Sequence, residues 1–265
     1  MERPVMDLHI RDEGDGPAIV LLHAFPCDGS MWDAQAAALR AAGLRTLVPD
    51  LPGFGKSALL TTAPNLEEVV RIVADEIAAR GIDRYLLGGL SLGGYLSMAW
   101  LRVRPQSVLG LMLCDTKASA DGAAAVLNRE RIAREVLANP DDSGAILAEA
   151  MMPVLVAEDS RANEDIMHRV TSWLDSAAPE SVAWYQSAMA QRPDSHGDLA
   201  RFTGPALVLR GEFDVMCGHD ELQSMHDALA SSIAVELPGV GHLAATEAPE
   251  LVSAALVEFV TTQAK

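Results

Sequence analysis

The chain has 265 residues, and 49% of them are hydrophobic, which suits one large domain with a sizeable buried core. Its formal net charge of −17 argues against nucleic-acid partners, because few positive charges are available to neutralise phosphates. No apolar run approaches the roughly 18 residues that span a membrane, and the acidic N-terminal stretch does not resemble a signal peptide.

The opening stretch, residues 5–16, alternates polar and apolar side chains and then turns, so we expect an antiparallel lead-in hairpin. Beyond it, short apolar runs alternate with helical patterns. The predicted strands cover residues 18–25, 44–50, 85–91, 108–115, 206–214 and 233–239. One helix is expected to begin after Asn65, a good N-cap residue, and to stop at Gly81. Apolar strands that alternate with helices predict an α/β fold with a mostly parallel sheet and helices on both faces.

The alternation is interrupted after residue 116. Residues 117–200 show helical patterns and no convincing strand. We therefore expect residues 1–116 and 201–265 to form the core, and residues 117–200 to form a helical cap, or lid, inserted between two strands of the sheet. Bulky side chains of the insert are expected to line the roof of a pocket: Met151, Met152, Trp173 and Trp184.

One serine stands among four glycines at the end of a predicted strand. Gly89-Leu90-Ser91-Leu92-Gly93 matches G-x-S-x-G, the nucleophile elbow, in which a strained strand–helix turn exposes the serine hydroxyl. A tight glycine turn without chemistry would show the same spacing. The partners of Ser91 decide between the two, because a serine hydroxyl needs a base and an orienting acid to become a nucleophile.

His242 is the best base among the seven histidines. It lies in a glycine-containing loop after the last predicted strand, at the edge where ligand sites gather in open parallel sheets. The chain order Ser…Asp…His requires an acid between Ser91 and His242. Asp214, at the end of the preceding strand, is the first choice, while Asp115 is the second and Glu212 a weaker third.

Two backbone N–H groups are needed to hold the negative charge of a tetrahedral intermediate. Leu92 follows the nucleophile and opens a helix, whose N-terminus favours negative charge. Phe25, in the loop after the first long strand, is the expected second donor to this oxyanion hole. His23 is expected to fix that loop by bonding to backbone.

Several segments together resemble the α/β-hydrolase fold enzymes over nearly the whole chain. They are HAFP at residues 23–26, DLPGFGKS at 50–57, GLSLGG at 89–94, GEFD at 211–214 and GVGH at 239–242. The short insert and the segment LCDTKASAD at 113–121 are similar to those of bacterial carboxylesterases and of hydrolases like 3-oxoadipate enol-lactonase. The resemblance implies a serine hydrolase acting as a carboxylesterase or lactonase.

We therefore predict a cofactor-independent serine hydrolase that cleaves small to medium carboxylic esters or lactones through an acyl-enzyme. Dehalogenases and epoxide hydrolases of this fold place aspartate at the elbow, so Ser91 argues against both. Cofactor-free perhydrolases and carbon–carbon bond hydrolases keep the serine triad and stay open as alternatives. A small-molecule receptor with a slow triad is a further alternative, because fold alone does not fix function.

Met216 and Leu243, beside the acid and histidine loops, are expected to form the floor of the pocket. No buried arginine or lysine is evident in the pocket segments, so we expect neutral substrates. A preference for an anionic substrate would point first to basic residues of the insert: Arg129, Arg131 and Arg134.

The three cysteines, Cys27, Cys114 and Cys217, are odd in number and show no C-x-x-C pattern. We interpret them as small buried hydrophobes and expect no metal site. A chain without a disulfide framework suits a reduced, cytoplasmic protein. The expected partner is a small-molecule ester or lactone substrate, and no membrane partner is expected. The sequence does not tell which oligomeric state the protein adopts.

Overall fold

The computed structural model describes residues 8–262 of the chain. Seven strands form one sheet in the order β1-β3-β2-β4-β5-β6-β7, and every neighbouring pair except β1 with β3 is parallel. The strands are β1 (Ile10–Glu13), β2 (Ala18–Leu22), β3 (Arg45–Pro49), β4 (Tyr85–Leu90), β5 (Val108–Cys114), β6 (Ala206–Gly211) and β7 (Ser232–Leu237). The predicted α/β class with a mostly parallel sheet is confirmed.

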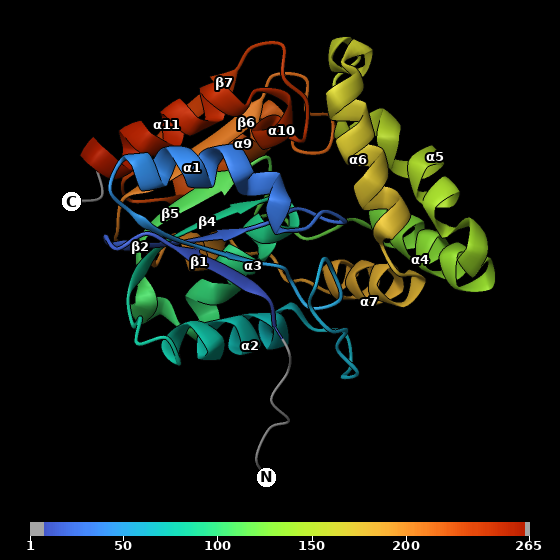
Figure 1. The fold of residues 1–265 in the computed structure, drawn as a ribbon, viewed down its shortest axis with the longest axis horizontal. Coiled ribbons are helices and arrows are strands. Elements are labelled where there is room, and N and C mark those ends of the chain that lie inside the picture. The colour runs from blue at the N-terminus through green and yellow to red at the C-terminus, as the bar shows by residue number, and fades with distance from the viewer. Residues whose placement is uncertain (1–7, 263–265) are drawn as a thin grey trace.

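Helices cover both faces of this sheet (Figure 1). The core contains α1 (Asp33–Ala41), α2 (Leu66–Ala78), α3 (Leu92–Val103), α9 (His219–Ala228), α10 (Ala244–Glu247) and α11 (Pro249–Thr262). The short helix α8 (His196–Leu199) falls within residues 117–200 but packs against α3 and α9. On one face α1 packs against α11, and on the other α2 packs against α3. In α2 the buried residues Val69, Val73 and Ile77 recur every four positions, so one apolar stripe faces the core.

The predicted lead-in hairpin is wrong in its pairing. Residues 5–7 lie outside the described part of the chain, and β1 pairs with β3 instead of with β2, its neighbour in sequence. The turn after β1 packs so tightly on the loop between α1 and β3 that a Cβ on Gly16 would lie 1.7 Å from the Gly43 carbonyl oxygen. Arg45 at the start of β3 also holds Asp12 of β1 through two bonds of 2.7 Å. These contacts place β1 on the outer side of β3.

Residues 117–200 hold α8 and four longer helices, and no strand. These are α4 (Ala123–Ala138), α5 (Ser143–Leu155), α6 (Glu164–Ser176) and α7 (Pro179–Ala190). They gather beside the sheet, with α4 against α7 and α5 against α6 (Figure 1). The segment leaves the sheet at the carboxyl end of β5, where Leu90 of β4 pairs with Cys114. Among the helices described, none has both the length and the apolar character to cross a membrane.

All three cysteines are free thiols and buried. Burial raises the pKa of each of them, so they are neutral thiols at neutral pH. This is the environment expected of small hydrophobic side chains.

Candidate active site

Ser91 forms the tight turn between β4 and α3. Its backbone has φ 54° and ψ −109°, a conformation that costs a residue with a side chain about 1–3 kcal/mol. The flanking glycines allow the close approach: a Cβ on Gly89 would lie 2.1 Å from the Gly93 carbonyl oxygen, and one on Gly93 would lie 2.0 Å from that of Leu22. The turn therefore has the strained strand–helix geometry expected of the elbow.

Two hydrogen bonds join Ser91, His242 and Asp214 into one chain. The Ser91 hydroxyl donates to His242 Nε2 over 2.8 Å, and His242 Nδ1–H donates to Asp214 Oδ2 over 2.8 Å. His242 comes from the loop between β7 and α10, and Asp214 comes from the loop after β6. The three residues are buried, with exposed fractions of 7, 1 and 3%. Residues that lie far apart in the sequence thus form a nucleophile–base–acid geometry.

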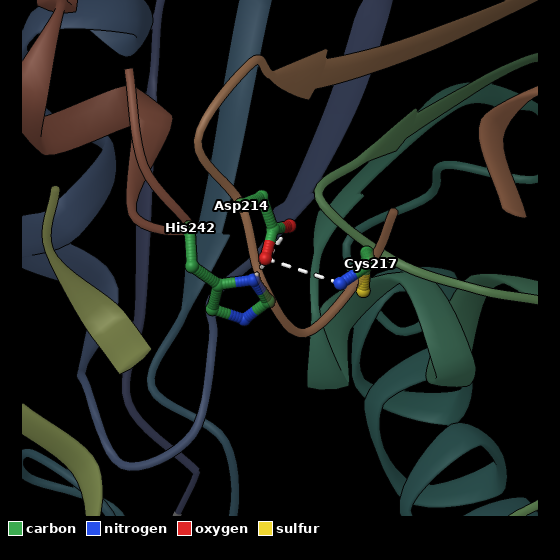
Figure 2. Close-up of side chains that lie close together, drawn as sticks. All are labelled: Asp214, Cys217 and His242. Carbon is green, nitrogen blue, oxygen red and sulfur yellow. Dashed lines mark hydrogen bonds and ion pairs between the residues drawn. The ribbon is translucent and has the colours of Figure 1, made fainter. Parts of the chain in front are cut away.

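The loop of Asp214 fixes its carboxylate. Oδ1 accepts the N–H groups of Met216 at 2.8 Å and of Cys217 at 3.1 Å, and Figure 2 shows the Cys217 bond beside the His242 ring. Burial acts to raise the pKa of Asp214, but His242 and the two N–H groups outweigh it and lower that pKa. Asp214 is therefore an anion at neutral pH, the form that accepts the histidine N–H.

Asp214, Cys217 and His242 also bring three potential metal ligands within 4.8 Å of one another (Figure 2). A thiol binds metal as the thiolate, and burial raises the pKa of Cys217 well above its ordinary value. Both carboxylate oxygens of Asp214 already accept N–H groups. The three side chains are arranged as hydrogen-bonding partners and do not fit a metal site.

Asp115, the second choice for the acid, lies near the triad without joining it. It is fully buried with φ 44°, and its Oδ1 accepts the Gly211 N–H at 2.7 Å. Within residues 8–262, Oδ2 has no hydrogen-bond partner. Burial, together with the charge of Asp214, raises the pKa of Asp115 well above its ordinary value. The carboxyl group is therefore neutral, and it makes no bond to His242 in the described structure.

Asp115→Asn is expected to stabilise the protein at neutral pH. Since the pKa of Asp115 is raised in the folded state, folding takes up a proton at pH values above the ordinary aspartate pKa, and this weakens stability as pH rises. Asparagine resembles the neutral carboxyl and removes that cost. Urea unfolding at pH 4.5 and pH 7.5 should show a gain in unfolding free energy that is larger at the higher pH. An equal gain or a loss at both values would contradict a neutral Asp115.

The two expected oxyanion donors come from adjacent strands. Leu92 is the first residue of α3, and the first N–H groups of a helix have no partner within it. β2 pairs with β4 in a register that sets Leu22 beside Gly89. Phe25 lies three residues beyond Leu22, as Leu92 lies three residues beyond Gly89. Both backbones therefore continue past the same edge of the sheet.

His23 braces the loop that carries Phe25. Its Nδ1–H donates to the Ala24 carbonyl at 2.8 Å, and its Nε2 accepts the Leu51 N–H at 2.9 Å. Burial lowers the pKa of His23, so the ring is neutral, as accepting an N–H requires. The expectation that His23 bonds to backbone is confirmed.

The side chains expected to line the pocket have definite packing partners. Four of them are buried and two half-buried: Met151, Trp173, Trp184 and Leu243, and then Met152 and Met216. The Trp173 indole N–H donates to Ser30 Oγ at 3.2 Å, and that of Trp184 donates to the Thr62 carbonyl at 2.8 Å. These bonds attach α6 to the helical turn before α1, and α7 to the loop before α2. Contact of these six residues with a substrate stays a prediction.

A buried ionic cluster was missed by the sequence analysis. Asp121 pairs with Arg129 at 2.5 Å, with Arg192 at 2.9 Å and with Lys117 at 3.5 Å. The side chains of Arg129, Arg192 and Lys117 are 15, 4 and 20% exposed. The sequence analysis named no buried basic side chain in the expected pocket segments, whereas Arg192 is buried in the inserted segment. Burial acts to raise the pKa of Asp121, but the two arginines outweigh it and lower that pKa.

Of the three arginines named as alternatives, only Arg129 turns inward. Arg131 and Arg134 are exposed, and Arg131 pairs with Glu135 one turn along α4. Lys117 and Arg129 lie 4 and 8 positions from Asp121, but Arg192 lies 71 positions after it, so no local spacing reveals the complete cluster. The sequence analysis named Arg129 as one of three candidate arginines, but nothing in the sequence distinguished it from Arg131 and Arg134.

The ionic cluster lies close to the elbow. The Arg192 guanidinium carbon lies 3.9 Å from the centre of the Tyr95 ring, and Tyr95 follows Ser91 by one helical turn. The Thr116 hydroxyl donates to the Ser91 carbonyl at 2.9 Å, and Lys117 is the next residue. The residue before Lys117 thus bonds to the Ser91 backbone, and Arg192 packs on the helix that follows Ser91.

Known proteins of several different activities are similar to this chain over nearly its whole length. Residues 19–255 match the alpha/beta hydrolase family. An esterase from Thermogutta terrifontis, solved with malate bound, is 35% identical with a TM-score of 0.93, over 98% of this chain and 95% of that one. The enol-lactonase of Burkholderia xenovorans is 25% identical with a TM-score of 0.86, over 97% of both chains. Haloalkane dehalogenase 2 of Mycobacterium tuberculosis is 29% identical, over 95% of this chain and 90% of its own length.

Proposed function

The chain belongs to the alpha/beta hydrolase family, and from this premise we propose that it is a serine hydrolase that cleaves carboxylic esters or lactones. The observation that carries the proposal is the hydrogen-bonded chain from Ser91 through His242 to Asp214, with 2.8 Å at each link. The esterase and enol-lactonase similarities support the same reaction class. A dehalogenase relative does not favour dehalogenation here, because this elbow carries a serine.

The reaction begins with proton transfer from Ser91 to His242 Nε2, as Ser91 Oγ attacks the carbonyl carbon. The oxyanion accepts the N–H groups of Leu92 and Phe25, at the positive N-terminal end of α3. His242 then protonates the leaving alkoxide, which leaves an acyl group on Ser91. Water, activated by His242, repeats these steps and releases the acid. Asp214 keeps the proton on His242 Nδ1 and stabilises the imidazolium.

Helices α4 to α7 would form the roof over this site in the proposed enzyme. Ser91 is only 7% exposed, and the chain of the insert leaves the sheet beside it. A closed site suits small to medium substrates. Met151, Met152, Trp173 and Trp184 would face the substrate from above, with Met216 and Leu243 below, where methionine side chains can adapt their shape.

A panel of p-nitrophenyl esters and lactones tests the proposed reaction. Turnover by the wild type that is lost in Ser91→Ala would support it. Ligand binding without turnover and without an acyl-enzyme would contradict it and favour a receptor. Turnover that requires hydrogen peroxide would favour a perhydrolase. Cleavage confined to carbon–carbon bonds would favour a carbon–carbon bond hydrolase.

The ionic cluster favours substrates that carry a carboxylate. Lys117, Arg129 and Arg192 face a single paired carboxylate, Asp121, among the residues that the structure describes. Buried charge is costly unless it is paired, so an anionic acyl group beside the cluster would relieve the excess. The Thermogutta esterase was solved with malate, a small dicarboxylate. We therefore replace the neutral substrate class with carboxylate-bearing esters or lactones of similar size.

Lys117→Gln is expected to lower kcat/KM for a carboxylate-bearing ester by about 10- to 100-fold, since a hydrogen bond to a charged group contributes about 1.5–3 kcal/mol. The matching neutral ester should be hydrolysed as before. Arg129→Gln should act in the same direction, and Arg131→Gln, on the exposed side of α4, is the control. Equal losses for both esters would contradict recognition of the charge by this cluster.

A further inference from the structure

Glu247 joins two segments that meet beside His242. It is the last residue of α10, five positions after His242. Its Oε2 accepts the N–H of Gly241 at 3.1 Å and the N–H of Ala157 at 3.0 Å. Gly241 immediately precedes His242, whereas Ala157 follows α5 in the inserted helices. One carboxylate oxygen therefore binds both the histidine loop and the insert.

A second bond connects the same two segments. The N–H of Leu243, immediately after His242, donates to the Leu155 carbonyl at 3.0 Å. Both backbone neighbours of His242 are thus tied to residues 155–157, one through Glu247 and one directly. The residues of this segment are buried although they belong to the insert.

The two segments pack so closely that position 241 has no room for a side chain. A Cβ on Gly241 would lie 2.4 Å from the Ala157 nitrogen and 2.7 Å from Glu247 Oε1. Glu247 Oε1 is itself buried and has no hydrogen-bond partner within residues 8–262. A buried acceptor without a hydrogen-bond partner costs free energy, so the burial of Oε1 does not stabilise the carboxylate where it lies. Its position is explained by the two N–H groups that it brings together.

We infer that Glu247 is a positioning residue, through which the contact of residues 155–157 sets the position of His242 in the triad. This inference rests on the proposed function of His242 as the general base. While residues 155–157 pack against the histidine loop, Glu247 holds Gly241, and His242 Nε2 stays 2.8 Å from Ser91 Oγ. Movement of the insert away from the core would release both neighbours of His242 together. The triad therefore has its active geometry only while the inserted helices pack against the core.

Glu247→Ala is the variant that tests this role, with Glu247→Gln as the conservative variant and Glu212→Ala as the matched control. Glu212, the third choice for the acid, is exposed and accepts the Gly239 N–H at 2.8 Å, so it binds the same loop without reaching the insert. Glu247→Ala is expected to lower kcat by about 10- to 100-fold, because a small misplacement of a catalytic group costs about that much. KM should change by less than about threefold. The glutamine variant keeps an acceptor oxygen and should recover most of kcat, and Glu212→Ala should match the wild type.

Backbone hydrogen exchange in the same variants gives a measure that does not depend on turnover. Loss of Glu247 should speed exchange at Gly241, at Ala157 and also at Leu243, whose own partner is unchanged. Continued protection of Leu243, or equal kcat losses in Glu247→Ala and Glu212→Ala, would overturn the coupling. A wild type that turns over no ester or lactone, with Leu243 released as expected, would instead reject the proposed function and leave the linkage standing.

Discussion

Ser91→Ala is expected to lower kcat by about 10⁶-fold, the size of loss seen when the nucleophile of a serine hydrolase is removed. The attacking oxygen disappears, and no other described hydroxyl bonds to His242. Alanine has a smaller side chain than serine, so the strained turn and the fold should persist. Steady-state hydrolysis of the best ester from the panel measures the effect, with KM or inhibitor affinity as the test of an intact pocket.

Ser97→Ala provides the matched control. Ser97 is a buried serine on the same helix α3, and its hydroxyl donates to the Gly93 carbonyl at 2.8 Å instead of to a base. Its replacement should leave kcat close to that of the wild type. Residual activity of Ser91→Ala within about tenfold of the wild type would show that another group performs the attack.

Asp214→Asn is expected to lower kcat by about 10⁴-fold, by analogy with the same exchange in serine proteases. The asparagine oxygen would keep the N–H groups of Met216 and Cys217, which turns the amide NH₂ toward His242 Nδ1. A donor there favours the tautomer with the proton on Nε2, which cannot accept the Ser91 proton. The fold should be preserved, since the side chain keeps its shape.

Asp115→Asn separates this effect from a general change near the site. Asp115 bonds to Gly211 and its carboxyl is already neutral, so kcat should stay within about tenfold of the wild type. The comparison needs only kcat values for the two variants and the wild type. If Asp115→Asn had the larger effect, the acid would be Asp115, directly after β5, and the roles of the two aspartates would have to be exchanged.

The triad could be predicted from the sequence because each member sits at a strand end with a local signature. The glycines around Ser91, the acid after β6 and the glycine loop before His242 all depend on short-range geometry that the sequence displays. The alternation of apolar strands and helices likewise predicts the parallel part of the sheet. In such a sheet the carboxyl ends share one edge, so the three loops must converge.

The remaining features depend on contacts between distant segments. The pairing of β1 with β3 follows from the packing of Gly16 on Gly43 and from the Arg45–Asp12 pair, neither of which has a local pattern. The basic cluster around Asp121 is assembled from residues up to 75 positions apart, from Lys117 to Arg192. Glu247 is one of many acidic residues in a sequence of net charge −17. Only its bonds to the N–H groups of Ala157 and Gly241 distinguish it, and these are visible in the structure alone.

Labelling with a serine-directed fluorophosphonate tests the central claim most directly, because the reagent reacts only with a serine that a neighbouring base has activated. Intact mass followed by peptide mapping identifies the modified residue, and Ser91→Ala serves as the blank. The account predicts one label per chain, on Ser91, and none on the Ser91→Ala variant. A label on another residue with Ser91 unmodified, or no label on a folded wild type, would contradict it.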